Sequence, residues 1–332
     1  MRIMIFRSAA FGDCIIITPL IRRLASLGHE LIVVTSGRGL QVFKGNPHIK
    51  TLLQHKEDTP LDKLSDYIDY LRRKHKADRV IDLSESIEVA LSLHPRGSEY
   101  KLTKPEKLSR FNRNFYEYTF EHCGEEWAEC DMLPELFFDY IELEEARSHL
   151  KSGAFNILLG MSGSGNNKAW PYNEHLCTAI CERFPDAHII TVGDERCKLI
   201  EPQIEGRITN LSGDIKMRIS MALTSMVDLV ISPDTGLIHA AGCYGTPKIC
   251  LLGHNTIECI TKYFENDYSV EADQAAAPCA PCLSLIYDIK LQCPIDLDTG
   301  AVFCMGKGIQ WQRVFNQVEK VYASAQKASQ PS

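Results

Sequence analysis

Hydrophobic and polar positions in the first half of the chain alternate in the order strand, helix, strand. Short apolar runs suit buried strands, and longer segments with apolar residues three and four apart suit helices. The predicted elements are strand 2–6, helix 13–27 closed by Gly28, strand 30–35, helix 61–75 and strand 79–83. This order predicts a parallel sheet.

After a charged and small-residue stretch at 144–154, the same alternation restarts and becomes more regular. The predicted strands are 156–160, 188–193, 207–211, 228–232 and 248–252, and the predicted helices are 173–183, 196–203, 216–225 and 237–243. Residues 311–322 have the apolar spacing of an amphipathic helix. A chain of 332 residues suits two domains. We expect them at 1–148 and 149–310, followed by a C-terminal helix and tail at 311–332.

The composition changes this picture little, since 45% hydrophobic and 24% charged residues are ordinary for a globular protein. A net charge of −7 argues against binding nucleic acid through a general electrostatic field. The apolar stretch 14–21 is too short to span a membrane, and residues 2–6 begin a strand without the features of a signal peptide. We therefore expect a cytoplasmic protein.

Three polar clusters follow predicted strands, where ligands bind in open parallel sheets. The first is the segment 7–13, which ends in Asp13. A carboxylate at this position can cap the following helix. It can also act as a general base that removes a proton from an acceptor hydroxyl.

The second cluster, 160–171, contains glycines and serines that let N–H groups and hydroxyls approach an anion, and Lys168 supplies a cation. It matches neither the Walker A spacing nor the dinucleotide fingerprint. A plain surface loop is the alternative interpretation.

The third cluster, 232–241, runs from a strand into a helix. Thr235 and Gly236 would offer a hydroxyl and two N–H groups to a diphosphate, with His239 one turn into the helix. Alternatively, Asp234 or Thr235 only caps the helix and His239 is half-buried.

Taken together, the clusters resemble glycosyltransferase family 9, the ADP-heptose:lipopolysaccharide heptosyltransferase family. The matching features are Gly12-Asp13 followed by Thr18-Pro19, the ending Lys168-Ala169-Trp170-Pro171, the run Asp234-Thr235-Gly236-Leu237-Ile238-His239-Ala240-Ala241, and Gly245-Thr246-Pro247 with Leu252-Gly253 beyond. They occur in the family's order along the chain. The family's usual Gly-Pro-Thr is Gly253-His254-Asn255-Thr256 here, which leaves donor identity open.

The resemblance implies the α/β fold called GT-B, in which two Rossmann-like domains have parallel sheets facing a central cleft. It assigns the acceptor to the N-terminal domain and the nucleotide sugar to the C-terminal one. It also implies inverting transfer of a sugar, most simply heptose from ADP-heptose, onto a hydroxyl of a lipopolysaccharide-core-like glycan, with no cofactor or metal for catalysis. The partners would be this donor and a glycan acceptor, with peripheral contact to a membrane-borne acceptor.

Carried onto this sequence, the resemblance makes Asp13 the catalytic base. Donor contacts would come from two clusters and from the end of strand 188–193: Ser162, Ser164, Lys168, Thr235, Gly236 and His239 at the phosphates, Asp234 ordering its loop, and Glu195 or Asp194 at the ribose. Growing charge on the leaving diphosphate is the physical reason for these donors.

Four cysteines between the last predicted strand and the C-terminal helix have the spacing C-x2-C-x10-C-x10-C: Cys279, Cys282, Cys293 and Cys304. Four thiolates at such spacing suit a structural Zn or Fe. Some family members similar to bacterial autotransporter heptosyltransferases carry an iron-binding cysteine set with longer spacings. The alternative is that these cysteines are reduced or incidentally disulfide-linked.

Residues 96–113 contain six Lys or Arg, including Arg110 and Arg113. A solvated charged face explains them. In an acceptor domain, Arg110 and Arg113 could also bind phosphate or carboxylate groups of the acceptor.

Other functions stay open at this point. The same transfer could use a protein or modified-DNA hydroxyl as acceptor, although the acidity of the chain makes DNA a poor candidate. A nicotinamide-dependent oxidoreductase would use a similar sheet, but neither first turn contains G-x-G-x-x-G. A non-catalytic nucleotide-sugar or redox-sensing binder is the third class.

Overall fold

The computed structural model describes all residues except 9, 57–58, 85–86, 88–89, 95–96, 162, 164, 287 and 329–332. The chain forms two compact units. The first unit comprises Met1–Ala90 and Phe115–Asp139, and the second comprises Leu91–Asn114 and Tyr140–Ser332. Each unit contains one parallel sheet with helices, as the strand and helix alternation predicts.

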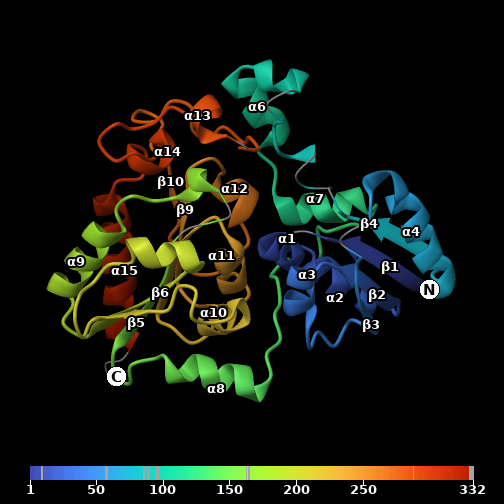
Figure 1. Ribbon diagram of the computed structural model, residues 1–332, viewed down its shortest axis with the longest axis horizontal. Helices are drawn as coiled ribbons and strands as arrows, with labels where there is room; N and C mark the ends of the chain where they lie inside the picture. Colours follow the sequence, from blue (N-terminus) through green and yellow to red (C-terminus); the bar gives the residue numbers. More distant parts are fainter. Residues whose placement is uncertain are drawn as a thin grey trace. The chain divides into compact units, whose positions relative to one another are not determined.

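The sheet of the first unit has four parallel strands in the order β3-β2-β1-β4. Its strands are β1 (Arg2–Arg7), β2 (Glu30–Thr35), β3 (Thr51–Gln54) and β4 (Arg79–Asp82), and its helices are α1 (Phe11–Ile16), α2 (Thr18–Ser26), α3 (Gly37–Phe43), α4 (Leu61–Lys74) and α7 (Phe115–His122) (Figure 1). The interior strand β1 is buried from its second residue onward. Its carboxyl end leads directly into α1, which positions Asp13.

The single helix predicted at 13–27 is two helices, α1 and α2, which meet at Ile17. Pro19 lies in the first turn of α2. It has no N–H to continue the hydrogen bonds of α1, but the first turn of a new helix does not need that donor, so α2 can begin there. The Thr18 hydroxyl donates to the Ile15 carbonyl at 2.8 Å and so satisfies one carbonyl at the end of α1. Gly28 follows α2 with a φ of 79°, as expected of a residue that closes a helix.

The second unit contains a six-stranded parallel sheet in the order β10-β9-β8-β5-β6-β7. Its strands are β5 (Phe155–Gly160), β6 (Ala187–Val192), β7 (Ile208–Asn210), β8 (Leu229–Pro233), β9 (Lys248–Leu252) and β10 (Val270–Glu271). Four of them, β5, β6, β8 and β9, are buried along their whole length. Burial on both faces explains why their sequences read as continuous apolar runs.

Helices cover both faces of this sheet (Figure 1). Odd-numbered strand residues pack with α9 (Asn173–Arg183) and α15 (Trp311–Ala328), in a core that includes Ile157, Leu159, Ile189, Ile231, Ile249, Leu176, Ile180, Val314 and Val318. On the other face lie α10 (Met217–Leu223) and α11 (Gly236–Ala241). Gly160 is close to α11, since a Cβ added there would lie 3.0 Å from the Leu237 side chain.

The remaining elements of the second unit are short and mostly lie outside the predicted pattern. They are η1 (Ser98–Lys101), α6 (Lys104–Phe111), α8 (Tyr140–Ser148), η2 (Asn166–Lys168), η3 (Glu195–Ile200), α12 (Ile257–Ile260), α13 (Ile289–Gln292) and α14 (Phe303–Gly306). The helix predicted at 196–203 is the 3-10 helix η3, and Pro202 follows its end. The charged stretch 144–154, after which the predicted alternation restarts, begins inside α8.

The division into units differs from the predicted boundary at 148. Helix α8 belongs to the second unit, where Glu142 forms a two-point ion pair with Arg218 of α10. Segment 91–114 also belongs there, because Leu93 pairs with Ser284 through the backbone and Lys104 donates to Gln274 at 2.8 Å. Contacts between residues so far apart in sequence do not affect the local hydrophobic periodicity, so the sequence pattern could not predict this division.

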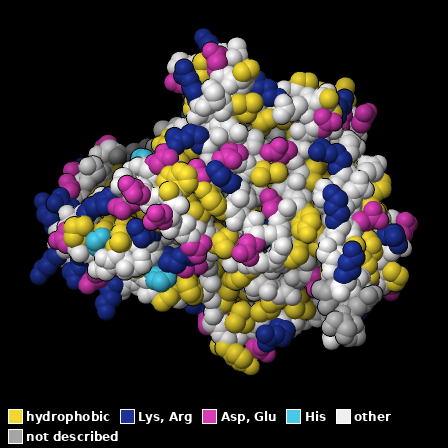
Figure 2. All heavy atoms as spheres, turned by 180° about the vertical axis from the view of Figure 1, so that it is seen from behind, with side chains coloured by type: hydrophobic (Ala, Val, Ile, Leu, Met, Phe, Trp, Pro, Cys, Tyr) yellow, Lys and Arg dark blue, Asp and Glu magenta, His cyan; other side chains and the backbone are white. Residues whose placement is uncertain are grey.

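The surface carries charges of both signs. On the face shown in Figure 2, acidic and basic side chains are interspersed. Within the described part of the chain, no helix is long and apolar enough to cross a membrane.

Removing the carboxylate of Glu142 should destabilise the second unit. The Arg218 Nε and Nη2 atoms each lie 2.6 Å from a Glu142 oxygen, and both side chains are largely buried. Glu142→Ala would leave the guanidinium buried without its anion, at a cost of about 3–5 kcal/mol. Denaturant unfolding followed by far-UV circular dichroism measures this loss. The exposed neighbour Glu145 is the control, and an equal loss in Glu145→Ala would contradict the assignment.

Candidate functional site

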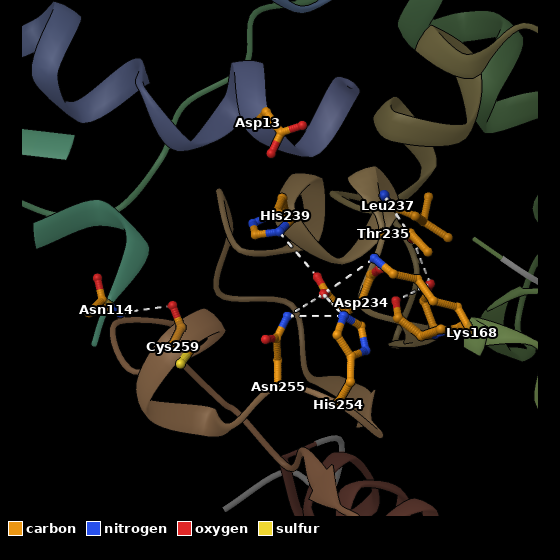
Figure 3. A network of polar contacts seen from close by, with 12 residues as sticks. Asp13, Asn114, Lys168, Asp234, Thr235, Leu237, His239, His254, Asn255 and Cys259 are labelled. Carbon is orange, nitrogen blue, oxygen red and sulfur yellow. Dashed lines mark hydrogen bonds and ion pairs between the residues drawn. The ribbon is translucent and has the colours of Figure 1, made fainter. Parts of the chain in front are cut away.

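The polar clusters of the second unit meet because β9, β8 and β5 are neighbouring parallel strands. Their carboxyl ends therefore share one edge of the sheet. Lys168 comes from the loop after β5, Asp234 directly follows β8, and His254 and Asn255 follow β9. Figure 3 shows these side chains converging on Asp234.

The Asp234 carboxylate is the centre of this network. Asn255 Nδ2 donates to its Oδ2 at 2.9 Å, and His239 Nε2 lies 3.5 Å from its Oδ1. Lys168 Nζ donates to the Asp234 carbonyl at 2.5 Å and lies 3.4 Å from Oδ2. Both the aspartate and His239 are buried. These contacts connect the segment after β8 with the loops after β5 and β9.

Burial works against a charged carboxylate at this position and by itself raises its pKa. The Lys168 ammonium and the His239 hydrogen bond outweigh burial and hold the pKa of Asp234 well below its ordinary value. Asp234 is therefore an anion near neutral pH. Burial lowers the pKa of His254 to about 4, with the Lys168 ammonium acting in the same direction and Asp234 opposing. His254 is thus neutral under the same conditions.

Thr235 and Gly236 form the start of α11. The Thr235 hydroxyl accepts from the Leu237 amide at 3.2 Å, so the capping alternative is correct for Thr235. No described residue accepts a hydrogen bond from the Gly236 amide. His239 is buried rather than half-buried and contacts Phe264 edge-on as well as Asp234. Capping and a polar network thus coexist in this segment.

The loop after β5 packs closely against α11. A Cβ added at Gly163 would lie 2.7 Å from the Lys168 side chain and 3.0 Å from the Thr235 side chain, so a larger residue there would displace the lysine. Lys168 ends the short helix η2, and 19% of its side chain is exposed. The predicted contacts Ser162 and Ser164 lie outside the described residues.

The two acidic candidates for the ribose follow β6. Asp194 caps η3 by accepting from the Arg196 amide at 3.0 Å and pairs with the Arg196 guanidinium at 2.6 Å. Glu195 is 75% exposed and lies 3.2 Å from Lys198. Neither residue joins the Asp234 network.

Asp13 lies in the first unit, at the third position of α1. Its Oδ2 accepts from the Ala10 amide at 3.2 Å, so the capping interpretation is correct in part. Its Oδ1 lies 3.4 Å from the fully buried guanidinium of Arg7, at the end of β1. This partner stabilises the ionised carboxylate, and 25% of the Asp13 side chain remains exposed.

Arg110 and Arg113, predicted to lie in an acceptor domain at 1–148, belong to the second unit instead. Arg110 is exposed on α6, and Arg113 is half-buried just beyond it. Helix α6 joins the second unit because its first residue, Lys104, donates to the carbonyls of Pro278 and Ala280. Lys104 of the basic stretch therefore holds the backbone beside Cys279.

All four predicted metal ligands line one cavity of about 240 Å³: Cys279, Cys282, Cys293 and Cys304. Burial raises the pKa of the Cys293 thiol, and Cys282 and Cys279 act in the same direction, so that the pKa is about 11. Yet no group of three or more His, Cys, Asp or Glu side chains is arranged to hold a metal ion in the part of the chain that the structure describes. The four predicted ligands therefore line the same cavity, but their side chains do not have the arrangement that binds a metal ion.

The residues that sequence reasoning missed are Asn167, which lines this cavity, and Arg7, His254 and Asn255. His254 and Asn255 follow a predicted strand, so the rule that located the other clusters could have found them. Arg7 begins the first predicted cluster, but its role was not identified there, because that role comes from its burial beside Asp13.

Comparison with known proteins bears on this site. Residues 142–285 match the model of glycosyltransferase family 9 (heptosyltransferase). A sequence search of curated proteins finds no match. The family match covers Lys168, Asp234, His239 and Asn255, but not Asp13.

Several solved structures share the fold. A family 9 glycosyl transferase from Veillonella parvula superposes with a TM-score of 0.70 at 18% identity, covering 97% of each chain. Heptosyltransferase II of E. coli gives a TM-score of 0.67 at 14% identity and covers 98% of this chain and all of its own. The iron-containing dodecameric glycosyltransferase TibC of enterotoxigenic E. coli gives 0.64 at 14% identity, covering 100% of this chain and 80% of its own.

Two parallel-sheet α/β units with these structural neighbours constitute the GT-B fold of heptosyltransferases. The match of residues 142–285 confirms the predicted resemblance to glycosyltransferase family 9, a family of sugar-transferring enzymes, over this part of the chain.

Proposed function

We propose that this protein is an inverting glycosyltransferase that moves heptose from ADP-heptose onto a hydroxyl of a lipopolysaccharide-core-like glycan. The observation that carries the proposal is the network of Lys168, Asp234 and His239, which joins the loop after β5 to the segment running from β8 into α11. All three residues lie within the region that matches the family. The E. coli heptosyltransferase WaaC, with a TM-score of 0.54 at 16% identity, has been solved with ADP.

In the proposed reaction, the bond between the anomeric carbon and the diphosphate oxygen breaks, and nucleoside diphosphate leaves with an added negative charge. Lys168 and the Gly236 amide would stabilise that charge. Lys168 is suited to this role because Asp234 fixes its ammonium while part of its side chain stays exposed. With this cation in place, the transfer needs no catalytic metal.

Asp13 would take the proton of the attacking hydroxyl, whose oxygen forms the new bond on the opposite face of the sugar. Two features of the first unit support this role. Arg7 favours the ionised carboxylate, and the Ala10 amide fixes its orientation at the start of α1. Arg110 and Arg113 would bind anionic groups of the acceptor, consistent with the exposure of Arg110.

We also propose that the four cysteines bind one structural Zn or Fe ion. Four thiols around one cavity provide a soft donor set, and Cys279, Cys282 and Cys293 are close enough to raise the pKa of Cys304 in addition to the effect of burial. Thiols in such a group become thiolates when a cation binds them. TibC, one of the structural neighbours, contains iron.

A thermal-shift screen tests the donor class. ADP-heptose at about 100 times its Kd should stabilise the protein by about 2.7 kcal/mol, while the same concentration of NAD should not shift the melting temperature. UDP-, GDP- and CMP-sugars complete the screen and separate nucleotide preference from general anion binding. Stabilisation by NAD with no response to any nucleotide sugar would overturn the proposed function.

Two substitutions should separate the base from the donor site. Asp13→Ala should lower kcat by about 10²–10⁴ and leave the donor Kd nearly unchanged, because the base contacts only the acceptor. Lys168→Ala should weaken donor binding as well as lower kcat, by about 10²–10³. Steady-state kinetics and calorimetric titration with donor measure both quantities. Unchanged turnover in Asp13→Ala would remove Asp13 from the mechanism.

Metal analysis tests the cysteine proposal. Anaerobically purified protein should contain about one Zn or Fe per chain by plasma mass spectrometry. The double variant Cys282→Ser/Cys293→Ser should lose the metal. Cys130 lies in the first unit, so the control variant Cys130→Ser should retain the metal. Folded wild-type protein without metal would contradict the proposal.

A further inference from the structure

The four residues after β9, Gly253–Thr256, are held in place from several sides. A Cβ added at Gly253 would lie 2.8 Å from Met305 Sδ and 3.0 Å from Cys304 Sγ. The His254 carbonyl accepts from the Leu283 amide at 2.9 Å. Thr256 accepts from the Cys259 amide at 3.1 Å and so caps α12. The side chains in the middle of this segment, His254 and Asn255, therefore project from a constrained backbone.

The Asn255 amide joins two partners (Figure 3). Its Nδ2 donates one hydrogen to Asp234 Oδ2 at 2.9 Å and lies 3.4 Å from His254 Nε2. An amide nitrogen has two hydrogens, so it can satisfy both. The opposite amide orientation would place an oxygen against the carboxylate and is excluded by repulsion. His254 Nε2 is then an acceptor, and the ring carries its proton on Nδ1.

This arrangement determines the orientation of Asp234. Asn255 holds one carboxylate oxygen, and His239 faces the other at 3.5 Å. With both oxygens engaged, the carboxylate cannot rotate without losing a buried hydrogen bond. Lys168 Nζ contacts the same residue twice, so its ammonium position follows from the position of Asp234.

We propose that Asn255 is a positioning residue of the transferase, that His254 holds its amide in orientation, and that the pair acts on the donor through Asp234 and Lys168. Neither residue contacts the reacting atoms in this scheme. The inference rests on the proposed function, since it assigns Lys168 to the donor diphosphate. It also gives a role to the two positions where the sequence departs from the family's Gly-Pro-Thr.

Asn255→Asp and Asn255→Leu test the orientation. Asn255→Asp places a second carboxylate beside Asp234, where two like charges cannot both persist next to one lysine. Activity should fall at high pH and recover as the pH is lowered, because a shared proton restores a hydrogen bond between the carboxyls. Among the described residues, the charged and titratable groups around this pair are Lys168, His239, His254 and the buried Cys250 thiol of β9. Asn255→Leu should weaken ADP binding about tenfold to a hundredfold at every pH.

A double-mutant cycle tests the route through Lys168. If Asn255 acts through Lys168, adding Asn255→Leu to Lys168→Ala should cause little further loss of ADP affinity. His254→Gln should retain ADP affinity, since its carbonyl oxygen can accept from Asn255, whereas His254→Leu should lose it. The control is His188→Leu, which removes another buried imidazole, bonded to Thr209, at the start of β6.

The outcomes separate the two proposals. Circular dichroism and melting temperature establish that each variant is folded. Wild-type protein that binds no ADP would overturn the proposed function and this inference with it. Wild-type protein that binds ADP, together with additive losses in the cycle or a pH profile of Asn255→Asp like that of wild type, would overturn the inference alone.

Discussion

The burial of one negative charge, the carboxylate of Asp234, is the constraint on which the rest of the candidate site depends. A carboxylate removed from water is costly unless cations and hydrogen-bond donors replace the lost solvation. Lys168, His239 and Asn255 supply that replacement, and each comes from a different segment of the chain. The charge therefore joins the loops after β5 and β9 to the segment that runs from β8 into α11, and it fixes the direction of the Lys168 ammonium.

The strand order of the second sheet makes this convergence possible. Strands β5, β8 and β9 are far apart in sequence but adjacent in space. In a parallel sheet, their following loops emerge at one edge. The same edge carries the cavity of the four cysteines, which His254 also lines. A single side chain thus faces both the Asp234 network and the proposed metal site.

Much of the fold could be predicted, because buried parallel strands and amphipathic helices have distinct periods. The predictions failed where local chemistry or distant contacts decided the outcome. Pro19 divides the first predicted helix into two. The helix predicted at 196–203 is a 3-10 helix that ends at Ile200, just before Pro202. Helix α8 and the segment 91–114 join the second unit through the Glu142–Arg218 pair and through Lys104, which periodicity cannot register.

By itself, the sequence determined the two α/β sheets, the strand ends that carry polar clusters and the relationship to glycosyltransferase family 9. These follow from hydrophobic period and from motif spacing, which are local properties of the chain. Only the tertiary structure decided that His239 is buried against Asp234, that Arg7 pairs with Asp13, and that Asn255 completes the network. Burial and pairing arise between residues brought together by folding, so no local pattern specifies them.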